Sequence, residues 1–179
     1  MIRLEFLRRR KTNRRNVTLR EGLADFFMER HFEAELRGLK NELIKMGGFV
    51  ERAIECAVEA IRAADAKTGE AKFQQIFSIE KKVNQAHKEV DDVCVRLLAL
   101  QQPLAADLRL IIAIIKINTD LERMGDQAVN IAHNSERFLK IEPKETIEGL
   151  KVMGDQVRAM VRGALDSFVN RDETLARKV

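Results

Sequence analysis

Apolar side chains recur along three long stretches of the chain at alternating steps of three and four residues. The first stripe consists of Leu36, Leu39, Leu43, Met46, Val50, Ala53, Ala57 and Ala60. The second consists of Ile76, Ile79, Val83, Ala86, Val90, Val93, Leu97 and Leu100. The third consists of Leu110, Ile114, Ile117, Leu121, Met124, Ala128 and Ile131, followed by Ser135 and Phe138. This spacing predicts three long helices, each turning one apolar face toward its neighbours in a bundle.

Residues that break helices separate these stretches. We expect Thr68-Gly69 to separate the first two helices, and Gln101-Gln102 to form the turn before a helix that starts at Pro103. Pro143 is expected to open a fourth helix. Since short connections join antiparallel neighbours, residues 28–140 are predicted to form an up-down-up, all-α three-helix bundle.

The third helix is also apolar outside its stripe, at Ile111, Ile112 and Ile115. A helix that is apolar on two sides needs a second packing partner, either in the same chain or in another protein. A shift of 111 residues aligns residues 160–169 with 49–58 and supports the first option, although chance similarity competes with it. A genuine repeat would make residues 143–179 the first helix of a second, incomplete three-helix repeat.

The positive charge is concentrated at the start of the chain. Residues 1–27 carry a net charge of +5 and the whole chain +4, so the remainder sums to −1. The basic isoelectric point therefore gives no support for nucleic-acid binding by the helical body. The longest apolar run, residues 110–115, is far too short to span a membrane, and no secretory signal precedes it. Cys56 and Cys94 fit two reduced, partly buried thiols.

Two polar stripes accompany the apolar ones. The second helix carries Glu80, Asn84, His87 and Asp91, and the third carries Glu122, Asp126, Asn130 and His133. Carboxylates four residues apart on a helix repel each other unless a cation compensates them, and oxygen-rich sites suit Mg²⁺, Mn²⁺ or iron. The competing interpretation is a solvated face that Arg123 or Lys81 neutralises.

No catalytic constellation is recognisable in the sequence. It contains no Glu-x-x-His pair of the di-iron type, no glycine-rich phosphate loop and no nucleophile motif. Gly47-Gly48 is interpreted as a kink or a close helix contact, and Gly125 as a close approach of another backbone or ligand. We therefore expect no catalytic residues.

Two segments resemble the signature sequences of the PhoU family. Residues 90–109 read VDDVCVRLLALQQPLAADLR, and residues 120–132 read DLERMGDQAVNIA. The resemblance covers about residues 28–179 and implies two three-helix bundles related by an internal repeat. Such chains begin near Met28, so residues 1–27 are expected to be a largely disordered extension.

This resemblance also implies a function. Members of the family are regulators of phosphate uptake that couple a phosphate ABC transporter to a membrane sensor histidine kinase. They restrain the phosphate-starvation response when phosphate is plentiful. We accordingly expect a cytoplasmic homodimer without enzymatic activity. It would contact the transporter ATPase subunit and the kinase, meet the inner membrane only through these partners, and bind no nucleic acid.

The resemblance further implies metal sites built from paired Glu/Asp-x-x-x-Asp motifs. Glu122 and Asp126 match such a motif. The counterpart on the second helix departs from it, because Asn84 stands where Asp is common and His87 where an acidic residue is frequent. We expect Mg²⁺, Mn²⁺, iron or Zn²⁺ at a set of six residues: Glu122, Asp126, Asn130, Glu80, Asn84 and His87.

Two other classes of function compete with this interpretation. The first is a nucleic-acid-binding helical protein that uses the arginine-rich start of the chain as an arm, which predicts binding with a steep salt dependence. The second is a metal-dependent helical-bundle enzyme, for which the sequence offers no base, nucleophile or pocket.

Overall fold

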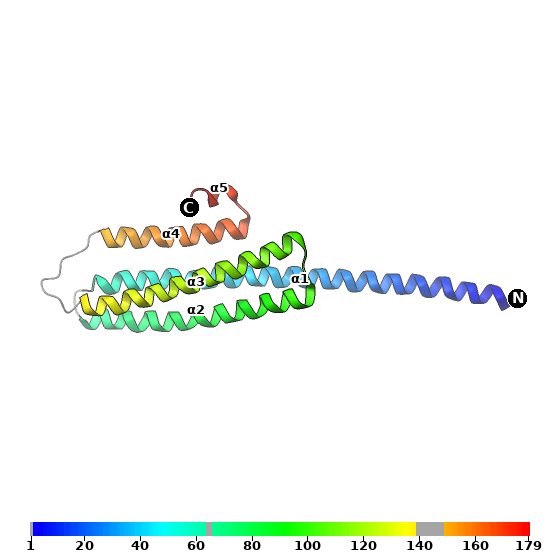
Figure 1. The fold of residues 1–179 in the computed structure, drawn as a ribbon, viewed down its shortest axis with the longest axis horizontal. Coiled ribbons are helices and arrows are strands. Elements are labelled where there is room, and N and C mark those ends of the chain that lie inside the picture. Colours follow the sequence, from blue (N-terminus) through cyan, green and yellow to red (C-terminus); the bar gives the residue numbers. More distant parts are fainter. Residues whose placement is uncertain (1, 64–65, 139–148) are drawn as a thin grey trace. The chain divides into compact units, whose positions relative to one another are not determined.

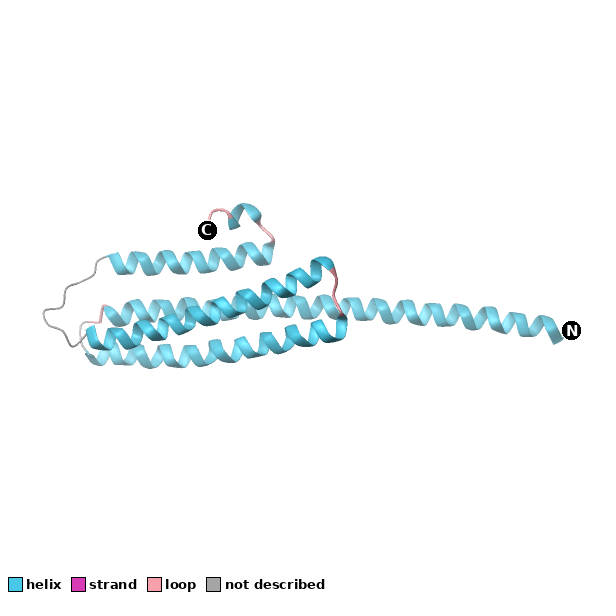
Figure 2. Cartoon of the chain, in the orientation of Figure 1, coloured by secondary structure: helices cyan, strands magenta, loops and turns pink. Residues whose placement is uncertain are grey.

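The computed structural model describes residues 2–63, 66–138 and 149–179, and it describes the side chains of residues 30–63, 67–135 and 149–179. In this part of the chain all regular structure is helical (Figures 1 and 2), as the periodicity predicts. The chain divides into two compact units, Met1–Gly38 and Leu39–Val179. Among the described residues, no helix is long and apolar enough to cross a bilayer.

Four long helices and one short helix make up the described structure. They are α1 (Ile2–Ile61), α2 (Ala66–Gln101), α3 (Ala105–Phe138), α4 (Gly149–Asn170) and α5 (Glu173–Ala176). Residues 2–38 of the first unit form one continuous stretch of α1, so the backbone of residues 2–27 is helical where the sequence led us to expect disorder. Arg, Leu, Lys and Glu, which favour helix, are frequent in this stretch.

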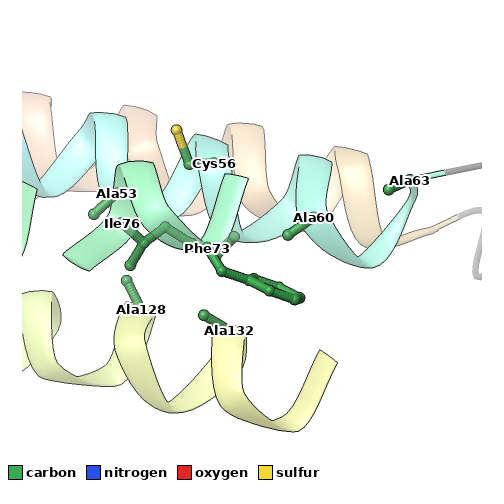
Figure 3. Close-up of a cluster of buried hydrophobic side chains, with 9 residues drawn as sticks. Ala53, Cys56, Ala60, Ala63, Phe73, Ile76, Ala128 and Ala132 are labelled. Atoms are coloured by element: carbon green, nitrogen blue, oxygen red, sulfur yellow. The ribbon is translucent and has the colours of Figure 1, made fainter. Parts of the chain in front are cut away.

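The core of the second unit lies where α1, α2 and α3 meet. The seven predicted stripe residues of α1 that belong to this unit, from Leu39 to Ala60, are all buried, and Leu36 of the first unit is buried as well. At one end of the bundle, small side chains of α1 and α3 surround Phe73 and Ile76 of α2 (Figure 3). The alanines at these positions let the helices approach closely. The α1 stripe was therefore predicted correctly in full.

The buried face of α3 differs from the predicted stripe at every second position. Ile111, Asn118, Gly125 and Ala132 are buried, whereas Met124 and Ile131 are 39% and 40% exposed. The prediction followed the apolar residues Leu110, Ile117, Met124 and Ile131, because the true stripe passes through an asparagine and a glycine. Ile111, which was expected to need a second partner, lies in the core.

The predicted turn near Pro103 is present but lies two residues later than expected, and the other predicted turn is absent from the described residues. Helix α2 ends at Gln101, and α3 begins at Ala105 after a turn that holds Pro103, with positive φ values at Gln102 and Ala105. By contrast, Thr68 and Gly69 lie within α2 and do not separate α1 from α2. Gly69 is buried. Pro143 lies outside the described residues.

Helix α4 packs antiparallel on the second half of α1. Arg162 Nε donates a hydrogen bond to Glu51 Oε1 at 3.3 Å, and a second nitrogen of Arg162 pairs with the other oxygen of Glu51. Arg158 lies 3.3 Å from Glu55 in the same interface. Glu51 and Arg162 are the two positions that the 111-residue shift aligns. If a two-fold axis related α1 to α4, equivalent positions of the two helices would meet at that axis, as Glu51 and Arg162 do.

Two glycines allow this close approach. A Cβ added at Gly47 would lie 2.1 Å from Leu165 Cδ1, and one added at Gly154 would lie 2.6 Å from Val58 Cγ2. Helix α1 continues through Gly47 and Gly48, so the pair marks a helix contact and not a break. The neighbouring Gly48 faces open space.

Candidate functional site

Helices α2 and α3 run antiparallel, and three contacts fix their register. Asn118 Nδ2 donates a hydrogen bond to Asp91 Oδ1 at 3.0 Å near one end. In the middle, a Cβ added at Gly125 would lie 3.2 Å from Val83 Cγ1. Toward the other end, the rings of His133 and Phe77 lie 5.2 Å apart between centroids. We call these facing edges, residues 77–91 of α2 and 118–133 of α3, the α2–α3 seam.

All six predicted metal-site residues lie along the α2–α3 seam. The register places Glu122 opposite His87, Asp126 opposite Asn84 and Asn130 opposite Glu80. Glu122 and the three residues of α2 are half-buried, whereas Asp126 and Asn130 are exposed. The fold therefore brings to matching levels of two neighbouring helices two stripes that lie more than 30 residues apart in the sequence.

Close packing at the middle of the seam depends on Gly125. This residue is buried against the side chain of Val83, where the sequence suggested a backbone or a ligand. An added Cβ would require the Val83 side chain to shift by a few tenths of an ångström. The glycine of the Glu122–Asp126 motif thus serves the close packing of α3 on α2.

On α2, the amide nitrogen of the Asn84 side chain is hydrogen-bonded, whereas its amide oxygen is not. Its Nδ2 donates a hydrogen bond to Glu80 Oε1. Its Oδ1 is buried and has no hydrogen-bond partner. A buried acceptor without a partner costs about 1–3 kcal/mol, so a water or a cation at this point would stabilise the seam.

His87 and Asp91 form a second polar group one turn further along α2. His87 Nε2 lies 3.5 Å from Asp91 Oδ2, while His87 Nδ1 is buried without a hydrogen-bond partner. Asn118 of α3 donates from Nδ2 to Asp91 Oδ1 and also to the backbone oxygen of His87, at 2.9 Å. Asn118 therefore ties α3 to both residues.

The geometry also limits how a metal ion could be held. Among the described residues, no group of three or more His, Cys, Asp and Glu side chains is placed to hold a metal ion. A cation at the seam would therefore use amide oxygens or water beside at most two such side chains. Arg123, considered as a neutralising partner for the acidic stripe, lies 3.9 Å from Asp120.

Asn118 is the site residue that the sequence did not reveal. It is fully buried, and its Oδ1 also has no hydrogen-bond partner. The available signal was an asparagine seven residues after Ile111 and four after Ile114, at a position that heptad spacing counted from Ile111 assigns to the core. Buried polar side chains at such positions are uncommon, and their partners indicate what they serve.

A concave surface lies between helices α1, α3 and α4. It is an apolar groove of about 580 Å³, and the side chains lining it include Ile54, Val58, Met124, Ile131 and Val157. Met124 and Ile131 belong to the stripe of α3 that the prediction assigned to the core. This face of α3 therefore borders a groove within the second unit.

The part of the chain that carries the α2–α3 seam matches a known family of proteins. The sequence profile described as the PhoU domain matches residues 43–135, which is more than half of the chain and includes all six candidate residues. The chain belongs to the PhoU family. The resemblance of residues 90–109 and 120–132 to PhoU signature segments is thereby confirmed.

Curated PhoU relatives and a solved PhoU structure agree with this assignment. The phosphate-specific transport system accessory protein PhoU homolog of Pseudomonas putida is 41% identical over 154 residues, covering 85% of this chain and 58% of that protein. Its namesake from Pseudomonas aeruginosa is 40% identical and is covered over 62% of its length. The crystal structure of PhoU from Pseudomonas aeruginosa superimposes with a TM-score of 0.73 at 40% identity, covering 82% of this chain and 69% of that chain.

The matched region is shorter than the PhoU relatives themselves. The chain spans about three fifths of the length of these two curated proteins. The family and the helical-bundle fold follow from these matches, and the two curated relatives are themselves named accessory proteins of phosphate-specific transport.

Proposed function

We propose that this chain regulates phosphate uptake and phosphate-starvation signalling by binding partners. It would couple a phosphate ABC transporter to a sensor histidine kinase and restrain the response when phosphate is plentiful. The observation that supports this most strongly is its membership of the PhoU family, whose curated relatives are named accessory proteins of phosphate-specific transport. Its place would be the cytoplasm, next to the inner membrane through its partners.

The proposed mechanism is differential binding. A regulator without a reaction of its own acts by favouring one state of its partner assembly and so shifting the equilibrium between states. The contacts with the transporter ATPase subunit and the kinase would be made by surfaces of the helical bundle.

A reporter assay tests this function. The chain is expressed in a bacterium that lacks its own PhoU-family protein, and a phosphate-starvation reporter is measured with ample phosphate. We expect the chain to lower the reporter signal, and the transporter ATPase subunit to copurify with it. A reporter that stays fully induced, together with no copurification from a well-expressed chain, would refute the proposal.

The proposed cofactor is one or more metal ions at the α2–α3 seam. The candidate donors are the carboxylates of Glu122, Asp126 and Glu80, the amide oxygens of Asn84 and Asn130, and His87, and any one ion would use at most two of the four carboxylate and imidazole groups. The unpartnered, buried Asn84 Oδ1 is the structural feature that suits a cation. Such an ion would neutralise facing carboxylates and hold α2 and α3 together.

Metal content tests the cofactor. We expect the double variant Glu122→Gln, Asp126→Asn to bind less metal by elemental analysis while its helicity by circular dichroism stays unchanged. Arg123→Gln is a matched control on the same turns of α3, and its metal content should equal that of the parent chain. Equal metal content in the double variant would count against these carboxylates as ligands.

A further inference from the structure

The densest run of positive charge in the chain lies at the start of α1, in a segment that the proposed function leaves unused. Residues 2–15 carry seven Arg and Lys residues and one acidic residue, Glu5. The backbone of this segment is helical, and it forms the N-terminal end of α1 (Figure 1). Six of the seven cations belong to residues 8–15, which span only about 10 Å along a helix axis.

The spacing of these residues leaves most of this charge without an acidic neighbour. Side chains three or four residues apart on a helix are neighbours, and like charges at that spacing repel each other. Arg10, Lys11, Arg14 and Arg15 have no acidic residue three or four positions away in either direction. They form two like-charge pairs four residues apart, Arg10 with Arg14 and Lys11 with Arg15. The helix at this point therefore favours an anion that it does not itself supply.

No other element of the same unit supplies that anion. The first unit, Met1–Gly38, consists of a single helix in its described residues, 2–38. Further along α1, cations do have acidic neighbours at helical spacing: Arg37 lies 3.9 Å from Glu33, and Lys45 lies 3.0 Å from Glu42. The basic run at the start of α1 thus differs from the rest of its own helix.

The residues that precede the basic run indicate which kind of anion suits it. Ile2, Leu4, Phe6 and Leu7 are large and apolar. The backbone of a nucleic acid would compensate the cations but would leave these side chains without a partner. An anionic bilayer suits both, because its headgroups attract Arg and Lys while the boundary with the acyl chains accepts apolar side chains.

The charge of the remaining chain agrees with this choice. The whole chain carries +4 and residues 1–27 carry +5, so residues 28–179 sum to −1. A nucleic-acid-binding protein extends its basic surface over the folded domain, whereas a membrane-binding segment acts at one end of a chain. The local charge and the local apolar residues together therefore favour a lipid surface.

We propose that residues 2–15 of α1 bind an anionic lipid surface, with the cations at the headgroup phosphates and the apolar residues at the acyl boundary. The segment would lie on the bilayer and not cross it. This contact is additional to the one that the proposed function makes through partner proteins, and it does not depend on that function.

The first experiment measures cosedimentation of the full chain with lipid vesicles. We expect binding to vesicles of equal parts phosphatidylglycerol and phosphatidylcholine, weakening as the salt concentration rises, and no binding to pure phosphatidylcholine. Each Arg or Lys near such a surface strengthens binding about fivefold. A quadruple variant should therefore bind the anionic vesicles on the order of 100-fold more weakly. Its substitutions are Arg10→Gln, Lys11→Gln, Arg14→Gln and Arg15→Gln.

A matched control removes the same number of charges from the second unit. It replaces four exposed cations of α2 and α3 by glutamine: Lys81→Gln, Lys88→Gln, Arg109→Gln and Lys116→Gln. The two quadruple variants have the same net charge, and the control should bind anionic vesicles like the parent chain. Equal weakening in both variants would mean that net charge and not this segment causes the binding, and the inference would be wrong.

The second experiment separates a lipid surface from a nucleic acid. The double variant Phe6→Ser, Leu7→Ser keeps every cation of the segment. We expect it to bind the anionic vesicles at least ~10-fold more weakly than the parent chain, because apolar area is no longer buried in the bilayer. Its affinity for a short DNA duplex, measured by fluorescence anisotropy at the same salt concentration, should equal that of the parent chain.

Two results would overturn the inference. The first is a parent chain that does not bind the anionic vesicles. The second is a double variant that binds them as the parent does, together with tighter binding of the DNA duplex than of the vesicles, which would make the basic run a nucleic-acid arm. Purified chain and vesicles contain neither transporter nor kinase, so both results are independent of the starvation reporter.

Discussion

The thiol of Cys94, on helix α2, is buried in the core of the bundle. Its ionisation makes the stability of the folded protein depend on pH. Burial raises the pKa of Cys94 from 9.0 to about 11, and the nearby charge of Asp91 adds to this rise. The folded state therefore favours the protonated thiol. Its contribution to stability is complete below about pH 9 and is lost as the pH rises toward 11, where the unfolded chain ionises first.

We accordingly expect the free energy of unfolding to fall by about 1 kcal/mol between about pH 8 and pH 10 through this residue. Denaturant unfolding at a series of pH values measures it. Cys94→Ala removes the titrating group, so its stability should decline less over the same range, whatever the cost of the smaller side chain. Identical pH slopes for the two proteins would show that Cys94 is not held protonated by the fold.

The site residues show how far single positions can be predicted from sequence. Glu122 and Asp126 were recognised by spacing and by resemblance, and the structure places them along one seam with Asn84 and His87. Whether they bind metal stays a prediction. Asn118 was missed because the neighbouring Ile117 fits the apolar stripe that the prediction followed, and its role follows only from the facing helix.

At the scale of the helix, periodicity predicted which elements form more reliably than which face is buried. The α1 stripe was correct because each of its positions carries an apolar side chain. In α3 the buried stripe passes through Asn118 and Gly125, and one position away lies a second stripe through Ile117 and Met124. Both satisfy the same spacing, and only the packing of α2 against Gly125 decides between them.

The contact between α1 and α4 leads to a prediction about two glycines. Gly154→Ala gains helix propensity, but its Cβ would lie 2.6 Å from Val58 Cγ2. The β-branched Val58 has little rotamer freedom in a helix, and such overpacking costs about 1–3 kcal/mol. We expect Gly154→Ala to lower the free energy of unfolding and to speed hydrogen exchange of α4 amides.

Gly48→Ala is the control for this variant. It lies inside α1 with nothing near its Cβ, so it should stabilise the protein by about 0.5–1 kcal/mol through backbone entropy alone. If Gly154→Ala proves as stabilising as Gly48→Ala, helix α4 does not pack on α1 through this glycine in solution.

At the scale of the second unit, α1 and α4 each carry an apolar stripe at helical spacing. The stripe of α1 is buried, whereas the stripe of α4 is exposed. Met46 of α1 is fully buried, while Val157, 111 residues later, is 40% exposed. Met153, Val157, Met160 and Ala164 follow one another at steps of four, three and four, and all are exposed. This spacing is that of a helix seam, and among the described residues no helix covers it.

The charges of α4 lie on another side of the helix. Arg158 and Arg162 pair with Glu55 and Glu51 of α1, and Asp155 lies 3.5 Å from Arg158. By helical spacing the exposed stripe is flanked instead by Gln156 and Gly163, which carry no charge. An uncharged apolar stripe of this kind favours association and can match a copy of itself about a two-fold axis.

We therefore expect two copies of the chain to pair through the open stripe of α4, with the mass of a dimer by light scattering. Introducing like charges with Met153→Glu and Val157→Glu would bring carboxylates together across the axis, so the double variant should have the mass of a monomer. Val95→Glu places the same charge on α2, at a side chain that is 63% exposed, and should leave the mass unchanged. A parent chain that stays monomeric at high concentration would rule out this pairing, and a dimer that survives both glutamates would place the interface elsewhere.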